Sequence, residues 1–326
     1  MSALVLIVLV AACASALMFA SIISGALISL VLCYLAPLPL MVAALSWGPL
    51  SASLAGIAAT IGLAAIFGAP YGFAFALTVA LPAWWLGHLA LLGRPITGQT
   101  AAGAADAPAP EFEWYPLGPL LLWIAGFAAL TTAAALLTLG DDASSITGVL
   151  RRGLLRILQV LGPQEGVTNQ DAEHWVDALV MLAPSAGAIV AMLTLALNLW
   201  LAAKITATSG RLHRPWPEFK NVTLPPMTLA ATCVAIAFCF SGGLIAILAA
   251  IITSALLMAY AFTGFAALHT LTLELKSRAV WLGVAYAAVV IFSWPLLVIV
   301  ALGLADAVFG LRQRYWQGRP PPLPVP

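Results

Sequence analysis

The chain has 326 residues, of which 63% are hydrophobic and 8% are charged, and its formal net charge is +1. Soluble domains carry roughly 25% charged residues, so this composition excludes an ordinary soluble domain. The small net charge also argues against nucleic acid as a partner, because binding nucleic acid requires clustered cationic surface.

The charged residues are segregated along the chain. The first is Arg94, and later uncharged blocks cover 178–203, 221–273 and 279–305. The opening block is long enough for about four bilayer crossings at ~20 residues each. We therefore predict an all-α, polytopic transmembrane helical bundle of about 8 to 9 spans, with one interfacial amphipathic helix and the lipid bilayer as its main partner.

Residues 1–93 are predicted to form the N-terminal transmembrane helices. Proline and glycine divide this block into four helices, near 3–22, 26–47, 50–68 and 72–92. Pro37-Leu38-Pro39 lies inside the second helix. Proline lacks a backbone N–H and clashes with the preceding turn, so we expect this helix to be kinked or discontinuous.

Small residues recur every four positions along the first helix, at Ala12, Ala16, Ala20 and Ser24. Such a stripe lets a second helix approach closely. Two interpretations stay open: packing within the chain, and a helix-docking surface for a partner membrane protein.

The next three segments differ in character. Small residues and prolines in 94–116 predict a flexible loop, and 117–139 is a fifth transmembrane helix. Residues 141–177 are predicted to be an exterior loop that contains an amphipathic helix. Its apolar positions recur every three and four residues, while Arg151, Arg152 and Arg156 fall on another face. This helix either lies at the interface with its arginines towards lipid headgroups, or packs over the bundle as a structural helix.

Residues 178–309 are predicted to contain the C-terminal transmembrane helices. The loop 204–220 is the most cationic, which predicts a cytoplasmic position. The block 279–305 contains Ser293-Trp294-Pro295 and is either one kinked helix or a re-entrant hairpin, so the side of the C-terminus stays open. Residues 310–326 are predicted to be a basic, proline-rich disordered tail.

Polar residues inside apolar blocks are candidates for function, because placing them in lipid is costly. The candidate ligand-binding residues are Asn198, His269, Thr272 and Asp306. Each has a structural alternative: Asn198 can join helices by hydrogen bonds, and Asp306 can pair with Arg312 or Arg278. The sequence has no nucleophile elbow, no H-E-x-x-H pair and no phosphate-binding glycine loop. We therefore expect no catalytic residue, no metal site and no cofactor.

The sequence contains three short motifs, which are Pro37-Leu38-Pro39-Leu40 followed by Gly48, the stretch Gly264-Phe265-Ala266-Ala267-Leu268-His269, and Gly303-Leu304-Ala305-Asp306 followed by Arg312. These motifs resemble those of the YybS-like, DUF2232 family of bacterial membrane proteins. The resemblance implies a location in the bacterial inner membrane. It also implies a distant similarity to the S components of energy-coupling-factor transporters, which dock their transmembrane partner through the first helix.

These observations favour a non-catalytic integral membrane protein with an S-component-like core. It would bind a small or lipid-like molecule, or scaffold a membrane complex, with a transport-related role as one form of this hypothesis. The alternative is a membrane enzyme that acts on a lipid, with His269 as its acid or base.

Overall fold

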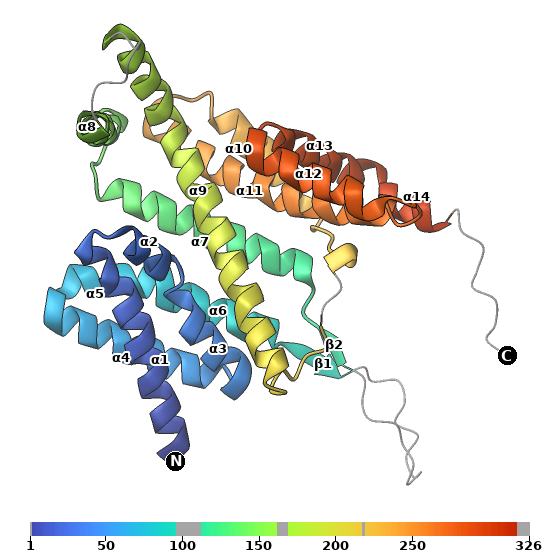
Figure 1. The fold of residues 1–326 in the computed structure, drawn as a ribbon, viewed down its shortest axis with the longest axis horizontal. Helices are drawn as coiled ribbons and strands as arrows, with labels where there is room; N and C mark the ends of the chain where they lie inside the picture. Colours follow the sequence, from blue (N-terminus) through green and yellow to red (C-terminus); the bar gives the residue numbers. More distant parts are fainter. Residues whose placement is uncertain (1, 96–111, 162–168, 217–218, 318–326) are drawn as a thin grey trace. The chain divides into compact units, whose positions relative to one another are not determined.

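The computed structural model describes residues 2–95, 112–161, 169–216 and 219–317, which are mostly helical (Figure 1). The chain divides into two compact units. The first consists of Met1–Phe127 and Leu193–Pro217, and the second of Ala128–Met192 and Glu218–Pro326. The predicted all-α membrane bundle is confirmed.

The first unit contains α1 (Ser2–Ala20), η1 (Ser21–Ser24), α2 (Leu27–Tyr34), α3 (Pro37–Trp47), α4 (Pro49–Phe67), α5 (Ala69–Phe75), the π-turn η2 (Ala76–Ala80), α6 (Leu81–Ala90), β1 (Gly93–Pro95) and β2 (Phe112–Trp114). Two helices, α7 (Leu117–Leu137) and α9 (Asn169–Thr208), run from one unit into the other. The second unit contains α8 (Ala143–Leu161), η3 (Phe219–Asn221), α10 (Met227–Phe238), α11 (Gly243–Leu271), α12 (Arg278–Phe292), α13 (Pro295–Phe309) and α14 (Leu311–Gln317).

The described residues include 7 segments long and apolar enough to cross a membrane, or 8 if α13 and α14, which meet at a 62° bend, count as one span. The sequence predicted about 8 to 9. The difference arises because α10 and α12 have only 12 and 15 residues. A crossing requires about 20 residues, so neither of these helices spans a bilayer alone.

In the first unit, α3 packs against α1, α4 and α6, and most of its residues are buried. Leu40, Met41 and Ala44 are fully buried. Gly87 of α6 lies against the Ala44 side chain, where a Cβ atom would overlap it. The predicted break at the prolines is present, because α2 ends at Tyr34 and α3 begins at Pro37.

The two ends of the loop predicted for 94–116 form short β-strands. β1 and β2 form an antiparallel pair in which Arg94 lies opposite Glu113, and their side chains form an exposed ion pair. Residues 96–111 of this predicted loop lie outside the described residues.

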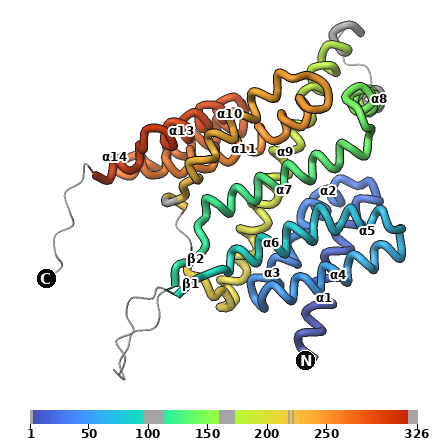
Figure 2. The backbone as a smooth tube through the Cα atoms, turned by 180° about the vertical axis from the view of Figure 1, so that it is seen from behind, coloured from blue at the N-terminus to red at the C-terminus, as the bar shows by residue number. Residues whose placement is uncertain are grey.

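In the second unit, α11 packs against both α10 and α13 (Figure 2). Two glycines make the contact with α13 close. A Cβ atom on Gly264 would overlap the Ile299 carbonyl oxygen, and one on Gly303 would overlap the Tyr260 carbonyl oxygen. Because residue 264 meets 299 and residue 260 meets 303, the two helices run antiparallel at this crossing.

The apolar block 279–305 consists of two helices. They separate at Ser293, which has a φ of 58°, and the Trp294 N–H donates to the Phe292 carbonyl at 2.6 Å. This geometry is a γ-turn with a positive φ, a strained conformation for a residue other than glycine. Pro295 then starts α13. Residues 311–317, predicted to be part of a disordered tail, form α14, and 318–326 lie outside the described residues.

The helix crossing yields the first prediction. Replacing Gly264 or Gly303 by alanine should destabilise the protein by about 1–3 kcal/mol, because the added methyl group overlaps a backbone oxygen of the facing helix. Thermal unfolding in detergent measures this effect. The control is Gly283→Ala, since a Cβ atom on Gly283 would meet nothing within 4 Å. Equal melting temperatures for Gly303→Ala and Gly283→Ala would show that the crossing is not tightly packed.

Candidate functional site

The structure places the four predicted ligand-binding residues in different units. Asn198 belongs to the first unit, whereas His269, Thr272 and Asp306 belong to the second. Among the described residues, no group of three or more His, Cys, Asp or Glu side chains could hold a metal ion.

Asn198 stabilises the break between α2 and α3. Its amide nitrogen donates to the Tyr34 carbonyl and to the Thr194 carbonyl, each at 2.8 Å. The Tyr34 oxygen needs this donor, because the Leu38 N–H that would serve it in a continuous helix bonds to Leu35 instead. Asn198 is 1% exposed, and its Oδ1 atom has no hydrogen-bond partner in the described part of the chain.

Two further hydroxyl groups hold α3. The buried Ser15 of α1 donates to the Ala36 carbonyl at 2.6 Å. Near the other end of α3, Ser46 and Thr206 of α9 share a hydrogen bond of 3.2 Å. Polar side chains of α1 and α9 therefore bond to a helix whose regular hydrogen bonding prolines have interrupted.

Cationic side chains in the segment that follows α9, residues 209–216, contact the ends of α3 and α6. Arg211 stacks over the Trp47 ring, at 4.8 Å from its centre, and Lys204 lies 5.4 Å from the Trp216 ring centre. Arg214 donates to the Ala90 carbonyl at 3.1 Å, and burial lowers the pKa of this guanidinium. These cations thus hold the segment in place on the first unit.

The small-residue stripe of α1 is partly used within the first unit, where α1 packs against α4 and α3. Ala12 is buried, Ala16 and Ala20 are half-buried, and Ser24 is exposed and bonds to Ser29 at 2.5 Å. Docking of a partner through this stripe stays a prediction.

His269 lies near the end of α11 and contacts α12. Its Nε2 atom and the Tyr286 hydroxyl are 2.8 Å apart, and the Tyr286 ring stacks on Phe265 with ring centres 4.9 Å apart. Arg278 approaches the His269 carbonyl at 3.5 Å. Thr272 donates to the Leu268 carbonyl of its own helix at 2.7 Å, so its hydroxyl caps α11.

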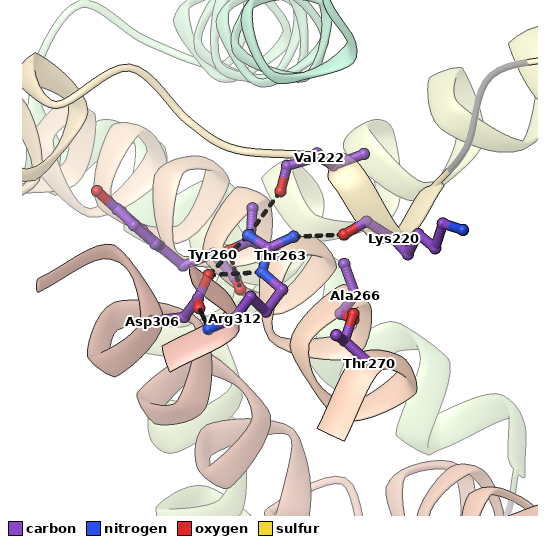
Figure 3. A network of polar contacts seen from close by, with 8 residues as sticks. All are labelled: Lys220, Val222, Tyr260, Thr263, Ala266, Thr270, Asp306 and Arg312. Atoms are coloured by element: carbon purple, nitrogen blue, oxygen red, sulfur yellow. Dashed lines mark hydrogen bonds and ion pairs between the residues drawn. The ribbon is translucent and has the colours of Figure 1, made fainter. Parts of the chain in front are cut away.

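Asp306 and Arg312 form a buried ion pair next to the α11–α13 crossing (Figure 3). Asp306 Oδ2 accepts from Arg312 Nη2 at 2.6 Å and from Nε at 2.8 Å. Asp306 Oδ1 accepts from the Arg312 backbone N–H at 2.9 Å. This contact bridges the bend between α13 and α14, where Gly310 adopts a φ of 62°. Of the pairings that the sequence suggested for Asp306, the one with Arg312 is present.

The same guanidinium also reaches the segment that precedes α10. Arg312 Nη1 donates to the Lys220 carbonyl at 2.7 Å, and Nη2 donates to the Val222 carbonyl at 2.8 Å. Both carboxylate oxygens and all three guanidinium nitrogens are therefore bonded within the chain. Such full bonding is what a buried ion pair requires to offset its loss of hydration.

The three arginines of α8 divide into two groups. Arg151 lies 3.0 Å from Asp177 and 3.9 Å from Glu173, both on α9. Arg152 and Arg156 are exposed.

Several partners in these contacts had not been predicted. The Lys220 and Val222 acceptors are backbone atoms, which leave no side-chain signal in the sequence. Tyr286 lies seventeen residues from His269, and only the fold brings the two together. Ser15 was detectable in principle, because it is a polar residue beside the Ala12–Ala16 stripe.

Comparison with known families relates the chain to a family of membrane proteins. The family model described as "Predicted membrane protein (DUF2232)" matches residues 119–307, which is more than half of the chain. No curated protein and no solved structure matches the chain. The matched residues include the α11–α13 crossing and Asp306, and end before Arg312.

The buried ion pair yields the second prediction. Asp306→Asn should destabilise the protein by about 3–5 kcal/mol, because it leaves the Arg312 guanidinium buried without a counter-charge. The matched control is Glu113→Gln, which neutralises the exposed partner of Arg94 and should cost less than about 1 kcal/mol. Unfolding in detergent, followed by circular dichroism, measures both changes. Similar losses in the two variants would contradict a stabilising role for the buried pair.

Proposed function

Since the chain belongs to the DUF2232 family of predicted membrane proteins, we propose that it is a non-catalytic scaffold of a membrane complex. Its role in this proposal is to present a fixed arrangement of transmembrane helices to other membrane components. It does so without converting a substrate.

The observation that carries the proposal is the bonding of the Asp306–Arg312 pair. A catalytic or transport site needs polar groups that are able to engage a substrate. Here the buried carboxylate and guanidinium are committed to each other and to the Lys220 and Val222 carbonyls. This buried ion pair of the second unit therefore supports a structural role.

Helix packing supports the same proposal. The glycine contacts bring α11 and α13 together at backbone distance, which favours a single rigid arrangement. By contrast, α12 has no fully buried residue, and exposed apolar side chains such as Trp281, Val290 and Ile291 are available to lipid or to a partner helix. A rigid core with an open apolar helix suits a protein that assembles with others.

The proposal includes an orientation in the bacterial inner membrane, with the loop 204–220 cytoplasmic because it is strongly cationic. The bonds from Arg312 to Lys220 and Val222 place the start of α14 beside the end of this loop. We therefore also place the C-terminus in the cytoplasm. Arg312 and Arg314 then follow the positive-inside rule.

This orientation yields the third prediction. A green fluorescent protein fused at the C-terminus should fluoresce, and alkaline phosphatase fused at the same position should be inactive, because both reporters would be cytoplasmic. The same pair of reporters at Ser209 is the matched control and should behave identically. If the reporters behaved oppositely at the C-terminus and at Ser209, the two positions would lie on opposite sides of the membrane, which would contradict the proposed orientation.

A second candidate function, binding of a small or lipid-like molecule by an S-component-like core, is favoured by one specific contact. Asn198 Oδ1 is a buried acceptor without a partner among the described residues, and it lies beside a discontinuous helix. Discontinuous helices often form the binding sites of transporters. A bound molecule with an N–H or O–H group would satisfy this atom, and so would an internal water.

The fourth prediction separates these functions. In a deletion strain, His269→Ala should correct any growth or envelope defect as well as the wild-type gene does, because a scaffold does not need this side chain for chemistry. Asn198→Ala should do the same wherever the variant still folds, since the lost side chain bonds the Tyr34 carbonyl. Expression level and melting temperature serve as controls for folding. Loss of function in folded His269→Ala would favour the lipid enzyme and contradict the scaffold. A small molecule retained by the wild type but not by Asn198→Ala in native mass spectrometry would favour the second candidate.

A further inference from the structure

We propose that Arg152 and Arg156 of α8 bind the phosphate group of an anionic lipid headgroup. This inference is independent of the scaffold function. The sequence pointed to three arginines on this helix, and the structure narrows the set to two.

The first half of α8 is anchored to the second unit. Ile146 is fully buried in a cluster with Leu136, Ala188 and Ile251, and Leu150 packs against the same cluster. At the start of the helix, Asp142 accepts hydrogen bonds from the Ser144 hydroxyl and from the Ser145 backbone N–H. Hydrogen bonds from Ser144 and Ser145 lower the pKa of Asp142 to about 2, so this capping carboxylate stays ionised at neutral pH. The helix therefore has a defined orientation.

Arg151 is not available to a lipid in this orientation. It is 3.0 Å from Asp177 and 3.9 Å from Glu173, and these contacts connect α8 to α9. The two carboxylates are in turn partly neutralised by Arg151. They therefore repel a nearby anion less than two unpaired acids would.

Arg152 and Arg156 have a different environment. They are four residues apart, so they lie on one face of the helix about one turn from each other. Both are exposed, and neither has an ion-pair partner within the described ranges. Asp142 is ten residues from Arg152, about 15 Å along the axis, and charges at this distance are largely screened at physiological salt. Two neighbouring exposed guanidinium groups can share one phosphate.

The position of α8 favours a lipid as the source of this phosphate. The apolar span of α7 ends at Leu137, and α8 begins at Ala143, so the start of α8 lies close to the edge of the bilayer. Ile157, beside Arg156, is 57% exposed. A cation next to an exposed aliphatic side chain suits the boundary between headgroups and acyl chains.

The experiment measures lipid retention by the purified full-length chain in native mass spectrometry. The probes are phosphatidylglycerol, phosphatidylcholine and inorganic phosphate. Each arginine near an anionic membrane surface contributes about 1 kcal/mol, or about fivefold in affinity. We therefore expect Arg152→Gln/Arg156→Gln to weaken retention of phosphatidylglycerol by about 30-fold and to leave phosphatidylcholine unchanged. Retention by the wild type should also fall as salt is raised.

The control is Arg314→Gln, which removes one exposed positive charge from α14 and should have no effect. Each single variant, Arg152→Gln and Arg156→Gln, should lose about fivefold. Unchanged melting temperatures would show that the variants are folded, as expected for exposed side chains. Equal retention of phosphatidylglycerol by the wild type and the double variant would overturn the proposal. If millimolar inorganic phosphate displaced the lipid, the proposal that a lipid supplies the bound phosphate group would be wrong. Arg152 and Arg156 would then bind a free phosphate compound.

Discussion

The structure depends on one constraint, which is that a polar group buried away from water must be bonded by the protein itself. The Asp306–Arg312 pair shows how the second unit meets this requirement. One guanidinium bonds a carboxylate across a helix bend and, at the same time, two backbone carbonyls from a segment ninety residues earlier. The pair thereby joins α13, α14 and the chain before α10 into one unit, next to the glycines that bring α11 and α13 together.

The first unit meets the same constraint with neutral groups. Pro37 and Pro39 interrupt a spanning helix, and the Leu38 N–H bonds to the Leu35 carbonyl in place of the Tyr34 carbonyl. Asn198 donates to the Tyr34 carbonyl and Ser15 to the Ala36 carbonyl, so the break is bonded by two other helices without a charge. This explains why a block of ninety-three residues can contain a discontinuous helix and no carboxylate or lysine. It also explains why Asn198, a candidate binding residue, has its nitrogen committed to structure, while its oxygen has no partner among the residues that the structure describes.

Much of this arrangement could be predicted from the sequence, and the limits follow from physical causes. The membrane location, the helix break at Pro37 and the amphipathic α8 depend on local composition and spacing, which a sequence displays directly. The Asp306–Arg312 pair was one of two suggested pairings, because few charged residues border the final apolar block. Its carbonyl acceptors could not be predicted, since every residue has a carbonyl group and only the fold selects which are within reach. The short α12 was partly predictable from Ser293-Trp294-Pro295, but the γ-turn that separates it from α13 was not. Similarly, spacing alone assigned three arginines to one role, whereas Arg151 is paired with acids of another helix.

The central claim, that the buried ion pair holds the second unit together, is tested most directly by a double-mutant cycle on Asp306 and Arg312. The free energy of unfolding in detergent would be measured for the wild type, Asp306→Asn, Arg312→Gln and the double variant. If the two side chains stabilise the fold through each other, the losses should be strongly non-additive, with a coupling free energy of about 2–3 kcal/mol. Losses that add to within about 0.5 kcal/mol would show that the two residues act independently and would contradict the account.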